Sequence, residues 1–430
     1  MKYFILAIFL LTYFGIVIRR DKANIFVYIS IFLFFIIKAI NFKDAFNFIN
    51  YNVLGIFLGT SILSFLFTNS KVPAYIVSKI EQKKLPVGII YLLICIVTSF
   101  ISAFIENVAT ILIMAPVALE FTRRNNLNPI PLFVGMAISS NLQGCATMVG
   151  DSPSIILAME TGMNFNDFFF MPATKLGLPS GKPGIFFFVQ FGALLSFFIL
   201  YLFFRREKGK VEYREEKKYN VKTYLPAFSL ILMIITLAIT SFFQDRFSFF
   251  PAVVCLSYGF ITALIYFKKF KDENVSIKQI DWDSFFLLIG IFILVGTIKK
   301  FGFIETVADF LLKTGGKNPF LLFNLIVWIS VLISSFVDNI PYTMAMISGI
   351  KILCSNLSLN PYLFLFGLLI GSSIGGNITP IGASCNVVGV GILKKNGYKV
   401  KFSDFVKIGL PFTVFAVSGS SLLLWFIYTR

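Results

Sequence analysis

The sequence predicts an all-α integral membrane protein made of two inverted-topology repeats, each with a re-entrant hairpin and a broken transmembrane helix. The first observation is the composition: 57% of the 430 residues are hydrophobic and only 14% are charged, which leaves too little polar surface to coat a soluble globule of this size. The second is an internal similarity between the two halves of the chain. The third is the distribution of positive charge between the apolar runs.

Apolar runs recur from end to end, and most are long enough to cross a hydrocarbon layer of roughly 30 Å as helices. The run at 3–18 lacks a small-x-small cleavage site and its strong positive charge follows it, so we expect a first membrane helix over 1–23 rather than a signal peptide. The most polar segment, 205–224, is expected to be a linker between repeat 1 (24–204) and repeat 2 (225–430). The further runs lie near 24–41, 50–68, 86–103, 110–122, 132–163, 184–204, 225–243, 249–267, 284–298, 320–337, 341–353, 361–393 and 405–428.

The two halves resemble each other when the sequence is compared with itself at a shift of 232 residues. From Ser102 to Ser154 no gap is needed, and 14 of the 53 positions are identical. The identities include Asn128-Pro129 with Asn360-Pro361, where proline at the first helical position is expected to mark the start of a helix. This pattern indicates an internal duplication.

Positive charge sets the orientation, because Lys and Arg accumulate on the cytoplasmic side of a membrane protein. The linker carries eight of them and is expected to be cytoplasmic. The other basic clusters also fall inside only if 86–122 and 320–353 enter the membrane and return on the same side. We therefore predict ten full crossings and two re-entrant hairpins that enter from opposite sides. Both termini are then expected outside a plasma (inner) membrane. The clusters are Arg19, Arg20 and Lys22; Lys71, Lys79, Lys83 and Lys84; Arg123 and Arg124; Lys268, Lys269 and Lys271; and Lys394, Lys395, Lys399 and Lys401.

Each predicted hairpin has a polar tip and is followed by a glycine-broken helix. The tips read SAFIENVAT (102–110) and SSFVDNIPYT (334–343), and the breaks in 132–163 and 361–393 read GCATMVGDSPS (144–154) and GNITPIGASCN (376–386). Unwound backbone survives inside a membrane where it lines a cavity or binds a ligand. The candidate substrate- and ion-binding residues are Glu106, Asn107, Thr110, Gly144, Thr147, Gly150, Asp151, Asp338, Asn339, Thr343, Gly376, Asn377, Thr379, Gly382, Ser384 and Asn386.

Two interpretations of the acidic residues Glu106, Asp338 and Asp151 stay open. A carboxylate at mid-membrane costs about 2.5–3.5 kcal/mol on insertion scales, so a protonatable or cation-binding role is one explanation. Capping of a helix N-terminus is the other. A transient Na⁺ is allowed at Asn107, Asn339, Thr147 and Thr379, whose oxygens suit a hard cation.

Several classes of function are disfavoured. The net charge of +17 lies in short clusters between apolar runs rather than along an aromatic groove, so we expect no nucleic-acid partner. Histidine is absent and the five cysteines show no CxxC spacing, so no cofactor and no resident metal are expected. Cys145 and Cys385 are interpreted as small buried residues, and contact with substrate is left open. No P-loop occurs, so any ATP drive needs a separate ATPase subunit.

Two hairpins with polar tips, each followed by a GxxTxxG-type break, resemble the ion transporter superfamily. The runs SSFVDNIPYTMAMI and GGNITPIGASCNVVGVGILKKNGYKVKFSDFVKIGLP (375–411) are similar to its arsenical pump and sodium/proton antiporter branch, which has a citrate-transporter-like domain. The first tip has Glu106 where that branch usually has Asp, and Ser152 and Ser154 stand where it usually reads GDPPN. The resemblance implies an elevator-type transport domain around a midplane site, and it allows a homodimer.

We therefore expect a proton-coupled secondary active transporter with no enzymatic activity, most consistent with an arsenite or antimonite efflux permease. Neither tip nor break contains Lys or Arg, and carboxylates repel an anion at low dielectric, which favours a neutral or cationic substrate. A sodium/proton antiporter is the first alternative. The second is a cation-coupled carrier of citrate, dicarboxylate, sulfate or silicate. A channel or a non-transporting membrane scaffold is the alternative from a different class.

Overall fold

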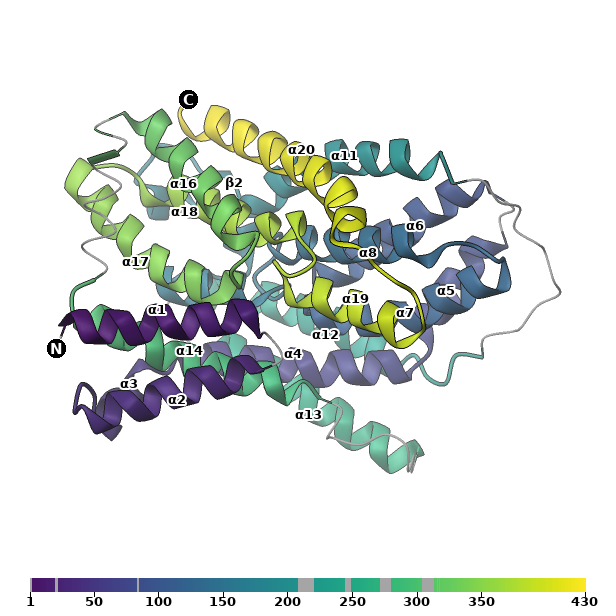
Figure 1. The fold of residues 1–430 in the computed structure, drawn as a ribbon, viewed down its shortest axis with the longest axis horizontal. Coiled ribbons are helices and arrows are strands. Elements are labelled where there is room, and N and C mark those ends of the chain that lie inside the picture. The colour runs from purple at the N-terminus through teal and green to yellow at the C-terminus, as the bar shows by residue number, and fades with distance from the viewer. Residues whose placement is uncertain are drawn as a thin grey trace.

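The computed structural model (Figure 1) describes residues 2–19, 22–82, 85–207, 220–243, 249–270, 280–303, 313–314, 316 and 318–430. Nearly all of its regular structure is helical. Much of the predicted linker lies outside the described residues, as does the predicted loop at Lys271.

Seven helices in the described part of the chain are long and apolar enough to cross a membrane, and the protein is a multi-pass membrane protein. Ten crossings were expected. The three remaining expected crossings fall on the shorter helices α1 (Lys2–Ile18) and α2 (Ala23–Ile36) and on a pair of helices, α8 and α9, divided by a break. That these three cross the membrane stays a prediction. The seven are α4 (Tyr51–Asn69), α11 (Ile185–Phe204), α12 (Leu225–Thr240) with the 3₁₀ turn Ser241–Phe243, α13 (Phe250–Phe270), α14 (Trp282–Lys300), α18 (Pro361–Gly375) with the 3₁₀ turn Gly376–Ile378, and α20 (Phe402–Tyr428).

Two helical hairpins occupy the ranges where the sequence predicts them. The first consists of α6 (Val87–Ser102) and α7 (Asn107–Arg124), and the second of α16 (Pro319–Ser334) and α17 (Asn339–Leu357). In both, the turn between the helices is the polar tip. Whether these hairpins are re-entrant, and whether the repeats are inverted across the membrane, stay predictions.

The two predicted broken helices are confirmed as interrupted helices. In the first, α8 (Pro129–Gly144) and α9 (Ser152–Thr161) flank seven non-helical residues, 145–151. In the second, α18 and its 3₁₀ turn are followed by five non-helical residues, 379–383, and then by α19 (Ser384–Lys395). Both begin as the sequence predicts: the side chains of Asn128 and Asn360 accept hydrogen bonds from the backbone two residues on, and proline follows each.

Short elements at the periphery were not predicted from the sequence. They are α3 (Phe42–Phe48), α5 (Val72–Glu81), a one-turn helix α10 (Ala173–Leu176), and an antiparallel ribbon of β1 (Phe170–Met171) and β2 (Lys182–Pro183). The ribbon pairs Phe170 with Pro183 and Met171 with Lys182. A 3₁₀ turn (Asn166–Phe168) precedes it. Elements this short carry too little periodic pattern to be read from sequence.

The helices pack in two groups. In the first group, which we call the frame, α4 packs on α13 and α12, while α1, α2 and α3 pack on or beside α14. In the second group, which we call the hairpin body, the two hairpins pack on the two broken helices, and α11 and α20 cover them. Glycine permits the close contact of α4 with α13, because a Cβ at Gly259 would lie 2.8 Å from the carbonyl oxygen of Gly59, and a Cβ at Gly59 would collide with the backbone of Cys255.

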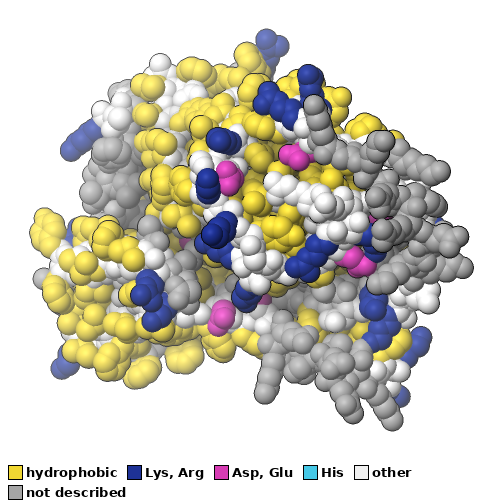
Figure 2. Space-filling view, turned by 45° about the vertical axis from the view of Figure 1, so that its right-hand side comes forward, with side chains coloured by type: hydrophobic (Ala, Val, Ile, Leu, Met, Phe, Trp, Pro, Cys, Tyr) yellow, Lys and Arg dark blue, Asp and Glu magenta, His cyan; other side chains and the backbone are white. Residues whose placement is uncertain are grey.

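The outer surface is strongly apolar, as a lipid-facing surface requires. Exposed side chains include Phe32, Phe100, Leu194 and Leu264, each at least 64% exposed. Figure 2 turns the end of the molecule near α5 and α7 toward the reader and shows Lys and Arg gathered there, with hydrophobic side chains around them. Lys and Arg are expected on the cytoplasmic side of a membrane protein, and the membrane face that this end meets stays a prediction.

Candidate functional site

Each hairpin tip ends in a carboxylate that caps the returning helix. Glu106 accepts hydrogen bonds from the backbone N–H groups of Val108 (2.8 Å) and Ala109 (3.2 Å) at the start of α7. Asp338 accepts one from Ile340 (3.2 Å) at the start of α17. The N-capping interpretation of these residues is therefore confirmed, and the positive end of each helix dipole faces a carboxylate.

Asp151 caps a third helix start, inside the first break. Its carboxylate accepts a hydrogen bond from the N–H of Ser154 (2.9 Å) at the beginning of α9. It also accepts one from the hydroxyl of Ser373 (3.0 Å), which lies on α18 in the other half of the chain. Asp151 is only 2% exposed. It therefore joins the first broken helix to the second.

The breaks fold back onto the hairpin tips in the same way in both halves. The hydroxyl of Thr147 donates to the carbonyl of Ala103, and that of Thr379 donates to the carbonyl of Ser335. These pairs are related by the same shift of 232 residues. The two threonine hydroxyls therefore bond to backbone, and Na⁺ binding by them stays a prediction.

The central glycines of the breaks are required by close contacts rather than by unusual dihedral angles. A Cβ at Gly150 would lie 2.9 Å from the carbonyl oxygen of Ala103, and one at Gly382 would lie 2.8 Å from that of Ser335. A Cβ at Gly144 would lie 2.5 Å from Oδ1 and 2.9 Å from Nδ2 of the Asn107 side chain. Any larger residue at these positions would separate break from tip.

An asparagine network connects the two broken helices at their centres. The amide of Asn141 on α8 donates to the carbonyl of Ser373 (2.6 Å) and to Oδ1 of Asn377 (3.1 Å), and it accepts from Nδ2 of Asn107 (3.1 Å). Asn377 in turn donates to the carbonyl of Ile138 (2.9 Å). Asn141 and Ser373 are 232 residues apart, so equivalent positions of the two halves are in direct contact.

Six predicted residues from both halves line one small cavity of about 30 Å³. No described residue lining it is basic. Among the described residues, no three Cys, Asp or Glu side chains are placed so that they could hold a metal ion. The six are Glu106, Asn107, Asp151, Asp338, Asn339 and Ser384.

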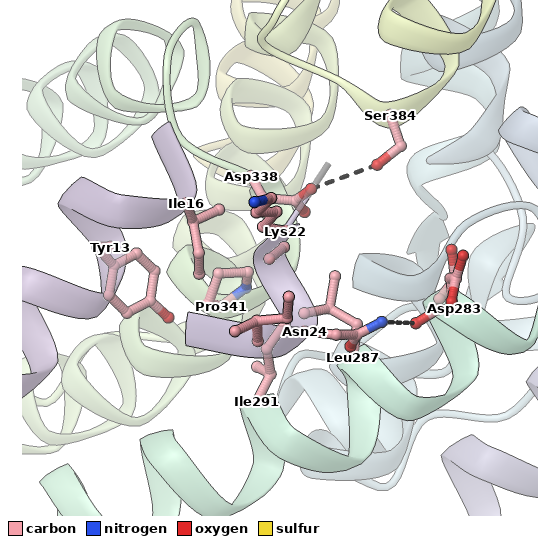
Figure 3. Close-up of a pocket in the computed structure, with 13 residues that line it drawn as sticks. Tyr13, Ile16, Lys22, Asn24, Asp283, Leu287, Ile291, Asp338, Pro341 and Ser384 are labelled. Atoms are coloured by element: carbon pink, nitrogen blue, oxygen red, sulfur yellow. Dashed lines mark hydrogen bonds between the residues drawn. The ribbon is translucent and has the colours of Figure 1, made fainter. Parts of the chain in front are cut away.

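Two larger cavities lie along the boundary between the frame and the hairpin body, and each reaches one tip. A cavity of about 190 Å³ lies between α4, the start of α14 and the first hairpin, and it includes Glu106. Another of about 420 Å³ lies between α1, α2, α14 and the second hairpin, and it includes Asp338 and Ser384 (Figure 3). The hydroxyl of Ser384 donates to the Asp338 carboxylate at 3.4 Å. The small cavity is therefore flanked by a larger one at each carboxylate tip.

The other predicted site residues support this arrangement without lining the small cavity. Thr110 donates to the carbonyl of Ile105 (3.3 Å), Thr343 donates to the hydroxyl of Ser372 (2.8 Å), and Asn386 donates to the carbonyls of Gly376 (2.9 Å) and Thr379 (3.0 Å). They hold the tips and breaks in position. The complete set of supporting predicted residues is Thr110, Gly144, Thr147, Gly150, Thr343, Gly376, Asn377, Thr379, Gly382 and Asn386.

Sequence reasoning missed several residues of the site. Asn141, Ser152, Pro153 and Cys385 line the small cavity. Asn141 had a visible signal, because it ends the polar triplet Ser139-Ser140-Asn141 within an apolar helix. Cys385 is buried and lines the cavity, whereas Cys145 donates to the carbonyl of Leu142 (3.2 Å) and does not line it.

Hairpins and interrupted helices that enclose buried polar cavities define the class to which this chain belongs, the membrane transporters. The family model described as "Citrate transporter" (CitMHS) matches residues 4–366. The chain belongs to this citrate transporter family.

Relatives of known sequence agree on the class. An uncharacterized transporter of Mycobacterium tuberculosis is 26% identical over 385 residues, covering 88% of this chain and 87% of the relative. An uncharacterized transporter of Synechocystis is 25% identical over 419 residues, covering 91% and 90%. The P protein of Sus scrofa is 25% identical over 446 residues, which cover 85% of this chain and 52% of that protein.

Two solved transporters share the fold. The YdaH transporter of Alcanivorax borkumensis superposes with a TM-score of 0.57 at 13% identity, covering 87% of this chain and 84% of that one. MtrF of Neisseria gonorrhoeae, from a class of antimetabolite efflux pumps, gives a TM-score of 0.52 at 14% identity, covering 89% and 82%. At this level of identity the likeness concerns the fold alone.

Proposed function

We propose that this chain is a proton-coupled secondary active transporter whose coupling site is the cavity lined by Glu106, Asp151 and Asp338. One observation carries the proposal: carboxylates from both halves of the chain, each capping a helix start, line one small cavity, and none of its described lining residues is basic. Acidic groups inside a membrane protein are expensive and mark ion or proton pathways.

The chemistry of coupling follows from what a capping carboxylate can bind. An ionised carboxylate accepts hydrogen bonds from helix N–H groups and attracts a cation, whereas a protonated one is a donor and loses most of that attraction. A proton and a cationic or donor-rich ligand therefore exclude each other at Glu106 or Asp338. Alternation between the two occupied states couples proton flow to transport.

The size of the small cavity supports separate places for the coupling ion and the substrate. A space of about 30 Å³ holds an ion or a single water. A larger solute must occupy one of the flanking cavities at the boundary between frame and hairpin body. The small cavity is therefore the coupling site, and the flanking cavities are where substrate reaches it.

An elevator motion is the mechanism that we propose for access. The hairpin body would slide as a unit against the frame, carrying the coupling site between the two membrane faces. Two features support movement of the hairpin body as one unit. The Asn141–Asn377 and Asp151–Ser373 hydrogen bonds join its two halves, and the two large cavities lie on its boundary with the frame. Contact between the equivalent residues Asn141 and Ser373 supports an inverted repeat, because equivalent positions meet at a pseudo-twofold axis.

For the substrate, a trivalent arsenic or antimony hydroxide remains our first candidate. Both are uncharged and rich in hydroxyl donors, which suits the 190 Å³ flanking cavity, where the described lining residues include the carboxylates of Glu106 and Asp281 and no basic group. A carried organic anion is the second candidate. It is favoured by the family's citrate transporter description and by Lys22, a cation that lines the 420 Å³ cavity beside Asp338.

Flux into proteoliposomes under an imposed pH gradient tests the proposal. The purified protein should accumulate arsenite or citrate only when the gradient is present, and sodium-driven proton movement without either solute would instead indicate a sodium/proton antiporter. Asp338→Asn should fold, as judged by an unchanged gel-filtration profile, and lose gradient-driven flux. Full coupled flux in that variant would rule out the coupling role.

A further inference from the structure

Six of the thirteen described residues that line the 420 Å³ cavity belong to or adjoin the N-terminal helix pair, which the sequence did not connect to the site. Tyr13 and Ile16 come from α1, Lys22 precedes α2, and Asn24 lies in its first turn. Figure 3 shows these side chains together with Asp338 and Pro341, and with Asp283, Leu287 and Ile291 of α14 below and to the right. The distance along the chain from Lys22 to Asp338 is more than 300 residues.

The N-terminal pair reaches the middle of the molecule instead of its end. In Figure 1 α1 ends and α2 begins near the centre of the long axis, whereas α4 continues well beyond that point. α2 has 14 residues and is therefore about 21 Å long, short of the roughly 30 Å hydrocarbon layer. Lys22 is thus brought close to the depth of the hairpin tip rather than to a membrane face.

Polar groups in this cavity have unused hydrogen-bonding capacity. The hydroxyl of Tyr13 and Oδ1 of Asn24 are buried atoms with no hydrogen-bond partner in the described structure. Buried polar atoms without partners are uncommon in folded proteins. The amide nitrogen of Asn24 is already used, because it donates to the carbonyl of Asp283 at 3.0 Å. Both open groups are therefore available to a bound molecule.

The arrangement of these groups defines the chemistry of an occupant. Lys22 is the only cation among the described lining residues and can donate to an anionic group, and the Tyr13 hydroxyl is a further donor in the same cavity. Oδ1 of Asn24 accepts a hydrogen bond from a donor on the same molecule. The carboxylates of Asp283 and Asp338 disfavour a second negative charge. Ile16, Leu287, Ile291 and Pro341 supply apolar wall.

We propose that this cavity binds a small organic acid that carries one carboxylate, an adjacent hydroxyl or amino donor, and an apolar body, with Lys22 as the residue that selects for the carboxylate. The proposal rests on the proposed function only in treating the cavity as part of the substrate path. It adds a site that the tips and breaks do not contain. It also revises the argument for a neutral substrate, which counted only the cations of the tips and breaks.

Binding to the purified full-length protein tests the proposal with a matched set of probes. Leucine and 2-hydroxyisocaproate combine a carboxylate, a donor and an apolar body, 4-methylpentanoate lacks the donor, and leucinol lacks the carboxylate. Leucine or 2-hydroxyisocaproate should raise the melting temperature of the wild-type protein, and the other two should do so at much higher concentration only. Absence of stabilisation by both complete probes would overturn the proposal.

Variants of Lys22 assign the selection to that side chain. Lys22→Gln should weaken binding of the stabilising probe by about tenfold or more, since a hydrogen bond to a charged group is lost, whereas Lys22→Arg should retain most of it. Lys43→Gln is the matched control, because Lys43 is an exposed lysine on α3 that does not line the cavity. Unchanged affinity in Lys22→Gln would overturn the assignment.

A labelling experiment tests the same electrostatics without any assumed substrate. All five native cysteines are buried, so Leu287→Cys, in the cavity wall, introduces a single reactive thiol. Anionic sulfonatoethyl and cationic trimethylammonioethyl methanethiosulfonate would be compared, and adding Lys22→Gln should lower the anionic-to-cationic rate ratio by about fivefold. An unchanged ratio would contradict the proposal. Since neither experiment measures transport, loss of proton coupling in Asp338→Asn would be a separate result.

Discussion

Replacement of Asn141 by leucine tests whether the two halves are held together at the centre of the hairpin body. Leucine has the same number of side-chain heavy atoms and the same branching, so the change removes hydrogen bonds and creates no cavity. Three buried groups lose a partner: the Ser373 carbonyl, Oδ1 of Asn377 and Nδ2 of Asn107. Each such loss costs about 1–3 kcal/mol, and local relaxation recovers part of it, so we expect about 3–5 kcal/mol in total.

The assay is thermal unfolding of the purified protein in detergent, followed by tryptophan fluorescence, together with flux in proteoliposomes. Asn141→Leu should lower the melting temperature by several degrees and reduce flux. Asn324→Leu is the matched control, because the half-buried Asn324 amide donates to the Phe320 carbonyl one turn earlier on the same helix (2.9 Å). If Asn141→Leu melted within a degree of wild type and transported normally, the asparagine network would not join the halves.

Three further predictions follow from local geometry. Gly144→Ala should destabilise the folded protein by about 1–3 kcal/mol, because the new Cβ would contact the side chain of Asn107. Gly391→Ala is the comparison: a Cβ there meets nothing within 4 Å, so this change should be neutral or stabilise α19 by up to about 1 kcal/mol. The melting temperatures of the two variants are compared with that of the wild type. Asn360→Ala should cost about 1–2 kcal/mol through loss of the α18 cap, and an unchanged melting temperature would contradict that. The hydrogen bond from Lys300 holds the pKa of the exposed Asp44 carboxyl below its ordinary value. The pair therefore stabilises the fold above about pH 4, and this contribution is lost as the pH falls through the lowered pKa. The difference in melting temperature between wild type and Asp44→Asn should disappear in acid, and a difference that persists there would argue against the pair.

Local features of this chain could be predicted because they depend on neighbours in sequence. Asparagine followed by proline starts α8 and α18 because the side chain caps the first turn and proline needs no backbone partner there. The glycine-rich stretches after Gly144 and Gly376 interrupt the helices where expected. The hairpin turns were also predicted from local sequence. In each hairpin two apolar runs are long enough to form helices, and the polar residues between them interrupt the apolar run and form the turn.

The role of the carboxylates was left open by the sequence and is resolved in part by the structure. Glu106, Asp151 and Asp338 each cap a helix start, which a search for capping residues could have found. Their common cavity could not be found that way, because Asp151 and Asp338 are brought together by the packing of α9 against α17. Coupling at these groups remains our proposal.

The sequence by itself determined that this is a multi-pass helical membrane protein with a duplicated hairpin and broken-helix unit, since hydropathy, capping and helix interruption are properties of adjacent residues. Only the tertiary structure decided which polar groups meet. Asn141 contacts Ser373 across 232 residues, and Lys22 shares a cavity with Asp338 from the far end of the chain. The physical reason is that a buried polar group must find its partner wherever helix packing places one, and packing between distant helices leaves no periodic pattern in the sequence.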